Sequence, residues 1–270
     1  MADRHSPDER NAVLDTLLTA SQGHPGLVAA VLVGSGAHGF TDEYSDIDMV
    51  VVADDAADVD TVSDGWKQRL LQQLPVMASS SVVRAPRVTL HNLYLSTYLE
   101  VNTSVLPLHL LQATKPNYRV LWDTTGTVEA TLDSTWAHRR FSQILPAYLE
   151  QRNASVWHYI NHADIALRRN RPWQALWDIE ELRSQIIHIR AHRMGLDPNR
   201  NRDTDALDAE FKGRIAELLV GSLDPGELRR TLVRTTALYF AESRNACADI
   251  GVHYDLEHLE ERMRTLVGTG

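Results

Sequence analysis

Two aspartates, Asp46 and Asp48, open an apolar run of the sequence, SDIDMVVV at residues 45–52. In a β-strand, residues two positions apart project from the same face, so the two carboxylates would lie side by side. Neighbouring carboxylates repel each other, and one of them has to stay protonated unless a cation lies between them. Mg²⁺ suits this place, because it binds through one or two carboxylates together with substrate phosphates. The pair therefore predicts a Mg²⁺ site.

A glycine-containing loop precedes the aspartates. A Gly-Ser-Gly sequence at residues 34–36 follows directly on the apolar run at 27–33. Glycines in such a loop let the backbone approach a phosphate, with N–H groups and the Ser35 hydroxyl as donors. Each pattern alone is common, since Gly-Ser turns often follow strands and Asp46 could cap a turn with Ser45. Together they predict a site for a nucleoside triphosphate.

The elements that must position these groups fall into two regions. In the first, apolar patterns predict strands at residues 27–33, 47–52, 88–95, 98–106 and 118–122, and helices at 7–22 (with Ser6 as N-cap) and 60–74. In the second, only helical spacing recurs, at residues 134–151, 154–170, 173–194, 204–220, 225–250 and from 256 onward. The sequence thus predicts an α/β front half and a helical back half, joined near residues 124–133.

Composition limits the classes of function. The 270 residues are 43% hydrophobic and 23% charged, as in a globular protein, and the net charge is −9. Residues 1–130 hold 8 Lys+Arg against 16 Asp+Glu, which favours metals and cationic small molecules over nucleic acid. No apolar run has the length of a membrane span, and the charged start is unlike a secretory signal, so no membrane partner is expected. The single cysteine, Cys247, suits a cytoplasmic location.

The loop and the aspartates also carry a family resemblance. Gly34-Ser35-x-Ala37-x-Gly39 followed by Ser45-Asp46-Ile47-Asp48 resembles the signature of the nucleotidyltransferase superfamily typified by DNA polymerase beta, and more narrowly its aminoglycoside and lincosamide branch. The resemblance covers residues 27–122. It implies an α+β fold, with a nucleotidyltransferase domain at 1–128, built on a mixed β-sheet flanked by helices, and a helical acceptor-binding bundle at 129–270. It also implies that the triphosphate is held by Gly34, Ser35, His38 and Ser45.

In that family a third carboxylate on a later strand completes the metal site or acts as base. The segment YLEVNTSV (residues 98–105) offers Glu100, which shares one strand face with Asn102 and Ser104. Without the resemblance, a solvated glutamate on a half-exposed strand is the simpler interpretation. With it, Glu100 is predicted to join Asp46 and Asp48 as catalytic group, metal ligand or both.

The implied reaction is adenylyl transfer. The enzyme would move AMP from Mg²⁺·ATP to a hydroxyl of a small, cationic molecule, most simply an aminoglycoside or lincosamide antibiotic, and release pyrophosphate. One departure bears on efficiency: relatives carry Arg or Lys in the loop where this chain has Gly36 and His38. A cation for the triphosphate would then come from protonated His38 or from Arg84, Arg87 or Lys115.

The helical half is expected to bind the acceptor. The segment RPWQALWDIEELR (residues 171–183) combines two tryptophans, expected in the core, with acidic residues, of which Asp178 and Glu181 are the predicted acceptor contacts. Three alternatives stay open. Arg183 and His188 match the Arg-x₄-His pattern of HEPN ribonucleases, although positions five apart converge on a helix only with help, for instance across a homodimer. The others are adenylylation of a protein and a nucleotide-binding sensor without activity.

Overall fold

The computed structural model describes residues 6–40, 42–114, 117–138 and 141–268. It divides into two compact units, residues 1–138 and 139–270, each with its own hydrophobic core. The sequence placed the boundary after residue 128. Helix α3 (Val128–His138) lies in between and belongs to the first unit, because Val128 and Leu132 pack against the sheet.

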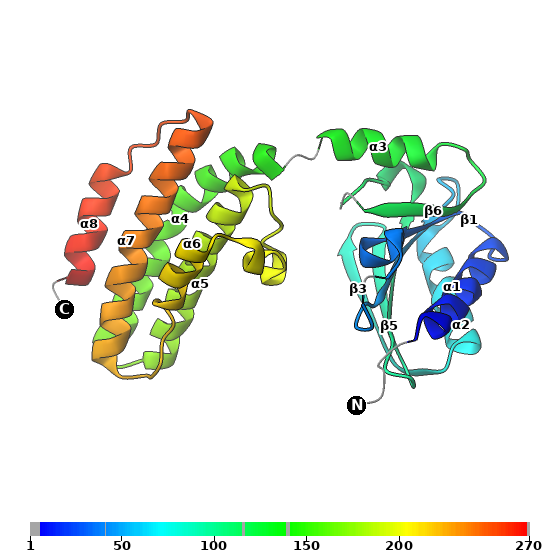
Figure 1. The fold of residues 1–270 in the computed structure, drawn as a ribbon, viewed down its shortest axis with the longest axis horizontal. Coiled ribbons are helices and arrows are strands. Elements are labelled where there is room, and N and C mark those ends of the chain that lie inside the picture. Colours follow the sequence, from blue (N-terminus) through cyan, green and yellow to red (C-terminus); the bar gives the residue numbers. More distant parts are fainter. Residues whose placement is uncertain (1–5, 41, 115–116, 139–140, 269–270) are drawn as a thin grey trace. The chain divides into compact units, whose positions relative to one another are not determined.

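The first unit is built on one six-stranded sheet (Figure 1). Its strands are β1 (Leu27–Val33), β2 (Ile47–Ala53), β3 (Val76–Ala85), β4 (Val88–Leu95), β5 (Glu100–Pro107) and β6 (Tyr118–Asp123), in the spatial order β3-β4-β5-β2-β1-β6. Strands β2 and β5 run parallel, whereas the other neighbours are antiparallel. The predicted mixed sheet flanked by helices, followed by a helical part, is confirmed.

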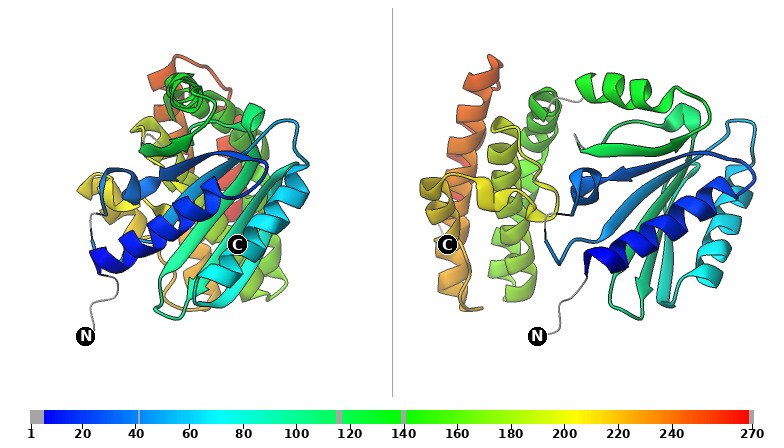
Figure 2. Two further views of the ribbon diagram at one scale, coloured as in Figure 1. Left: turned by 90° about the vertical axis from the view of Figure 1, so that its right-hand side faces the viewer. Right: turned by 45° about the vertical axis from the view of Figure 1, so that its right-hand side comes forward.

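Two helices cover one face of this sheet. Helices α1 (Pro7–Gln22) and α2 (Val59–Gln73) lie along this face in Figure 2, and their apolar side chains pack onto the strands. Trp66 of α2 is fully buried there, and its indole N–H donates to Thr103 Oγ1 of β5 at 3.1 Å. Alternate strand residues, such as Ile47 and Met49, point into this core. Asp46 and Asp48 therefore project from the opposite face.

The second unit is helical throughout its described residues. It consists of α4 (Phe141–Arg168), α5 (Pro172–Arg193), α6 (Ala209–Ala216), α7 (Pro225–Ile250) and α8 (Glu257–Gly268), with short 3₁₀ turns between α5 and α6 (Figure 1). Leucine, isoleucine and aromatic side chains of α4, α5 and α7 form its core. None of the described helices combines the length and the apolar character needed to cross a bilayer.

The observed elements differ from the predictions in several places. Helix α3 begins at residue 128, ahead of the predicted start at 134. Strand β3 was missed, because nearly all its residues are exposed and it carries no apolar alternation. The predicted break near residues 152–153 lies inside α4, where buried Asn153 accepts hydrogen bonds from Tyr239 and Ser243 of α7. Helix α6 begins only at residue 209, because the Asp208 carboxylate caps it by accepting from the backbone N–H of Phe211.

Candidate active site

The structure brings Asp46 and Asp48 together at the start of β2. The amide nitrogen of Asn102, opposite Asp48 on β5, donates to Asp46 Oδ2 and to Asp48 Oδ1, both at 3.2 Å. The two carboxylate oxygens therefore lie no more than twice that distance apart. Both side chains are half-buried, so water only partly screens their repulsion. One amide between them offsets part of that cost and keeps the pair in place.

This arrangement fits a divalent cation. Mg²⁺ needs only one or two carboxylates from a protein when substrate phosphates supply the rest of its octahedron. Asn102 Oδ1 is buried and has no hydrogen-bond partner, so the amide carries an oxygen that no other group uses. The described residues contain no group of three or more acidic, histidine or cysteine side chains placed to hold a metal. Asp46, Asp48 and Asn102 are thus the groups that could hold it.

Replacing Asn102 tests this geometry. Asn102→Asp adds a third carboxylate and removes the bridging donor, so we expect Mg²⁺ to bind about tenfold more tightly. The metal-free protein should become less stable, because three carboxylates then repel each other. Thermal unfolding followed through a Mg²⁺ titration measures both effects. Asn11→Asp, at an exposed position on α1, is the control, and an unchanged titration midpoint in Asn102→Asp would count against the site.

A buried arginine holds the loop that leads to the aspartates. Arg10 of α1 is 3% exposed, and its Nη1 donates to the carbonyls of Asp42 (2.6 Å) and Ser45 (3.3 Å) while its guanidinium covers the Phe40 ring. The Ser45 hydroxyl donates to Asp42 Oδ1 at 2.9 Å, which lowers the pKa of the Asp42 carboxyl. Ser45 is buried in this loop. The hydroxyl of Ser45 therefore holds the loop segment just before Asp46 in place.

The glycine loop forms a 3₁₀ turn over residues 34–38. Gly34 has φ +73° and is buried, and its N–H donates to the Asn117 carbonyl at 3.0 Å. A side chain at Gly36 would begin 3.0 Å from the Phe40 ring and 3.2 Å from the Leu32 side chain, so these neighbours would have to shift to admit it. Ser35 and His38 are exposed. Of the predicted phosphate-binding residues, these two present their side chains to solvent.

Glu100 lies on the face of the aspartates but not in their hydrogen-bonded cluster. It begins β5 two residues before Asn102, and it pairs with Tyr94 of β4. Its side chain is exposed and lines a hollow toward β3 and β4. At this position Glu100 is better placed to contact an incoming molecule than to coordinate a metal ion beside Asp48.

Two of the predicted sources of positive charge, Arg84 and Arg87, lie away from the aspartates. Arg87, in the turn after β3, exerts its charge on Asp55 and Asp58, which follow the end of β2. Asp46 precedes the start of β2, so the seven residues of the strand, about 20 Å, separate the two ends. Arg84 stands at the same far end of β3, and Lys115 lies outside the described residues. The basic side chain of the glycine loop itself is His38.

In the helical unit, Asp178 is buried and the neighbouring tryptophans are exposed, which is the reverse of the burial expected from the sequence. Asp178 is 3% exposed and its Oδ2 has no partner, whereas Trp173 and Trp177 are 70% and 58% exposed. Burial raises the pKa of the Asp178 carboxyl, while His162 and His158 of α4 act in the opposite direction. The Trp177 ring lies 6.3 Å from Tyr159 of α4. The tryptophans predicted in the core thus stand at the surface beside a buried acid.

Glu181 lies one turn further along α5 and is half-buried. The Arg183 guanidinium forms an ion pair with Glu180, and the His188 ring lies 6.0 Å from Tyr148. Arg183 and His188 therefore each have neighbours of their own in this helical unit. Nothing in these contacts favours the ribonuclease alternative.

Asp178→Asn should stabilise the protein at neutral pH. The folded state holds the Asp178 proton more tightly than the unfolded chain, so stability from this group is present below the unfolded pKa and is lost as pH rises through the folded pKa. Asparagine stays neutral throughout. We expect Asp178→Asn to raise Tm by a few degrees at pH 7 and to leave it unchanged near pH 4. A lower Tm at pH 7 would show that Asp178 is instead ionised and paired with His158 or His162.

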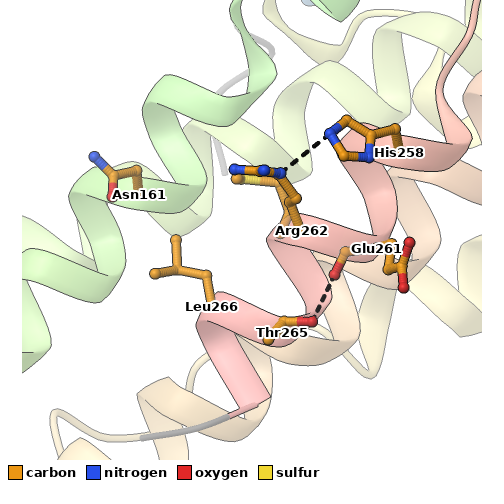
Figure 3. A pocket seen from close by; sticks show the side chains of 7 residues that line it. Asn161, His258, Glu261, Arg262, Thr265 and Leu266 are labelled. Carbon is orange, nitrogen blue, oxygen red and sulfur yellow. Dashed lines mark hydrogen bonds between the residues drawn. The ribbon is translucent and has the colours of Figure 1, made fainter.

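A hollow of the helical unit lies between α4 and α8. It measures about 710 Å³ and is lined by Asn161, His258, Glu261, Arg262, Met263, Thr265 and Leu266. Figure 3 shows Arg262 donating from Nε to His258 Nε2 at 3.1 Å, and Thr265 donating to the Glu261 carbonyl. Both hydrogen bonds run between neighbouring turns of α8, so they hold these lining residues to their own helix.

Comparisons with known proteins give the following. No family model and no curated protein matches the chain. Among solved structures, an aminoglycoside 6-adenyltransferase from Bacillus subtilis aligns over 97% of this chain and 98% of its own, at 10% identity and a TM-score of 0.41. The Cid1 poly(U) polymerase aligns over 58% of this chain and 42% of its own, at 18% identity and 0.33. A cytoplasmic RNA terminal U-transferase aligns over 59% and 42%, at 18% and 0.31. These values define no family for the chain.

Proposed function

We propose that this chain is a Mg²⁺-dependent nucleotidyltransferase that moves AMP from ATP to a hydroxyl group of a small molecule. The observation that carries the proposal is the pair Asp46 and Asp48, bridged by Asn102 on a sheet face that α1 and α2 leave uncovered. Two half-buried carboxylates held this close have no structural benefit of their own. A cation that binds the two carboxylates together with substrate phosphates would give the pair a function.

In this proposal each residue has a role that follows from its position in the site. Mg²⁺ held by Asp46 and Asp48 would neutralise charge on the triphosphate. Ser35 and His38, exposed on the glycine loop, would bind its phosphate oxygens. Glu100 would accept the proton of the acceptor hydroxyl. The acceptor oxygen then bonds to the α-phosphorus, the bond from that phosphorus to the bridging oxygen breaks, and pyrophosphate leaves with the bond's electron pair.

The acceptor we propose is a cationic small molecule of the aminoglycoside or lincosamide kind. Asp178 and Glu181 of α5 support this, because a buried carboxyl with one oxygen free of hydrogen bonds, near exposed Trp177 and half-buried Tyr159, would suit an ammonium group. A carboxylate in such surroundings is stabilised by an opposite charge and poorly stabilised without one. Asp178 would therefore favour amines over neutral or anionic molecules.

The test is release of pyrophosphate from Mg²⁺·ATP, screened against a panel of aminoglycosides and lincosamides. Asp48→Asn is the inactive variant, and Asp15→Asn, an exposed position on α1, is its matched control. Release that requires one acceptor, persists in Asp15→Asn and stops in Asp48→Asn supports the proposal. Tight Mg²⁺·ATP binding with no release across the panel would replace it with a protein target or a sensor.

A further inference from the structure

A hydrogen-bonded network of side chains lies on the sheet face that α1 and α2 cover, opposite to the face of the aspartates. The His91 network consists of Ser63 and Lys67 of α2, Ser81 of β3 and His91 of β4. Strand pairing sets Ser81 opposite His91, and His91 opposite Thr103 of β5. Paired residues share a face, and Thr103 accepts the indole N–H of Trp66 on α2. The network is therefore separate from the candidate active site.

His91 is 1% exposed, and both of its ring nitrogens have partners. Nε2 lies 2.8 Å from the hydroxyl oxygen of Ser63, which is also buried, and Nδ1 lies 2.9 Å from Ser81 Oγ. Lys67 Nζ, one turn along α2 from Ser63, donates to the same Ser81 oxygen at 2.8 Å. Ser81 itself is exposed. A hydroxyl at the surface thus contacts both an imidazole and an ammonium group.

The surroundings of His91 favour a neutral ring with its proton on Nε2. Burial lowers the pKa of His91, and the charge of Lys67 lowers it further, so the ring is neutral at pH 7. A hydrogen bond with the Ser63 backbone and the charge of Asp64 act in the opposite direction. A backbone carbonyl raises the pKa of a histidine by accepting from a ring N–H, and Nε2 is the nitrogen that faces Ser63. The proton is thereby assigned to Nε2, which leaves Nδ1 to accept from the Ser81 hydroxyl.

These contacts meet the structural requirements of an activated serine. A nucleophile needs a base within hydrogen-bond reach, about 2.6–3.2 Å, and the base needs a third group that holds its orientation. His91 is that base and Ser63 is that third group, while the Lys67 ammonium favours negative charge on the serine oxygen. A buried histidine needs hydrogen-bond partners, but packing does not require one of them to be an exposed hydroxyl beside a cation. Because β3 is an edge strand with nearly all its residues exposed, molecules from solvent can reach Ser81.

We propose that Ser81 is a catalytic nucleophile, activated by His91, that hydrolyses small activated carboxylic esters. Ser81 Oγ bonds to the carbonyl carbon while its proton passes to His91 Nδ1, and the carbonyl oxygen takes up an electron pair whose charge the Lys67 ammonium stabilises. When the carbonyl double bond forms again, the ester C–O bond breaks, and the alcohol leaves with that bond's electron pair and the proton from His91. Water then attacks the acyl group by the same route, which releases the carboxylic acid and returns a proton to Ser81 Oγ. The reaction needs no nucleotide, so it does not depend on the proposed transfer.

A fluorophosphonate probe tests the nucleophile directly, because the oxygen of an activated serine bonds to its phosphorus and fluoride leaves. The folded protein is labelled at pH 7, and peptide mass spectrometry locates the label. Ser81→Ala is the test variant, and Ser79→Ala is its matched control, since Ser79 is exposed on the same face of β3. His91→Gln and Lys67→Met remove the base and the ammonium group, and circular dichroism checks that each variant is folded. Release of p-nitrophenol from p-nitrophenyl acetate measures turnover.

We expect the wild type and Ser79→Ala to be labelled at Ser81 and to release p-nitrophenol at equal rates. Ser81→Ala and His91→Gln should lower both rates about 100-fold or more, and Lys67→Met at least about tenfold. If His91→Gln does not fold, Ser81→Ala decides alone, because this side chain is exposed. Rates that are unchanged in Ser81→Ala, or labelling that is equally fast in heat-denatured wild type, overturn the inference. Labelling of Ser81 without release of p-nitrophenol also overturns it, because the proposed cycle then does not run.

Discussion

Asp48→Asn should lower the rate of nucleotidyl transfer on the order of 10³-fold or more while leaving the protein folded. Carboxylate-bound Mg²⁺ supplies several kcal/mol of charge stabilisation in reactions of this class, and each 1.36 kcal/mol is a factor of ten in rate. Asparagine keeps the shape of the side chain but removes the charge that faces Asp46 across Asn102. Steady-state pyrophosphate release at saturating Mg²⁺ and ATP measures the loss.

Stability separates this effect from a folding defect. With EDTA present, Asp48→Asn should unfold at the same temperature as the wild type or higher, because the substitution relieves repulsion within the pair. With Mg²⁺ and ATP, the wild type should gain stability by ligand linkage and the variant should not. Asp15→Asn should match the wild type in both conditions. An Asp48→Asn protein that is unstable in EDTA would show that the carboxylate is structural, and the metal site would lose its main support.

Asp48 could be singled out from the sequence because it departs from a local rule. An acidic residue among Ile47, Met49 and Val50 contradicts the pattern of a buried strand, and such conflicts mark functional positions. Asn102 could not be recognised in the same way. The contact of Asn102 with the aspartates depends on the register of β5 beside β2, which places Asn102 opposite Asp48. This pairing joins residues 54 positions apart in the sequence. An asparagine on a strand carries no sign of such a neighbour.

Buried polar residues account for most of what local patterns missed. Arg10 looks like an ordinary charged residue of an amphipathic helix, yet it holds the loop before Asp46 through two carbonyls. The predicted break at residues 152–153 includes Asn153, a poor helix former, yet tertiary hydrogen bonds from α7 keep this residue inside α4. Long apolar strands and capped helices, such as Ser6 before α1, were predicted correctly since their signals are local.

The stability of the helical unit depends on another buried polar residue, the carboxylate of Glu242. Glu242 of α7 has a side chain only 2% exposed, and three arginines approach it. Arg193 Nη1 lies 3.0 Å from Oε2, Arg214 Nη1 lies 3.6 Å from Oε1, and Arg190 Nη1 lies 3.8 Å from Oε2. Arg190 and Arg193 have second partners in Asp208 and Asp249. Glu242 therefore links α5, α6 and α7 through one desolvated charge.

Glu242→Ala should lower the free energy of unfolding of the helical unit by about 3 kcal/mol. Removing one member of a buried ion-pair network leaves uncompensated charge and a void, which costs about 3–5 kcal/mol. The lower end of this range applies because Arg190 and Arg193 still form ion pairs with Asp208 and Asp249. Urea unfolding, followed by far-ultraviolet circular dichroism, reports on this unit through its helices.

Glu217→Ala provides the matched control, because it breaks an Arg–Glu pair of equal chemistry at the surface. Glu217 and its partner Arg234 are 68% and 52% exposed, so the pair should contribute about 0–1 kcal/mol and weaken further in salt. A buried pair is screened far less, so the cost of Glu242→Ala should persist at 1 M NaCl. Equal effects of the two substitutions would mean that water reaches Glu242, and that packing of α5 against α7, with no help from this charge, holds the helical unit together.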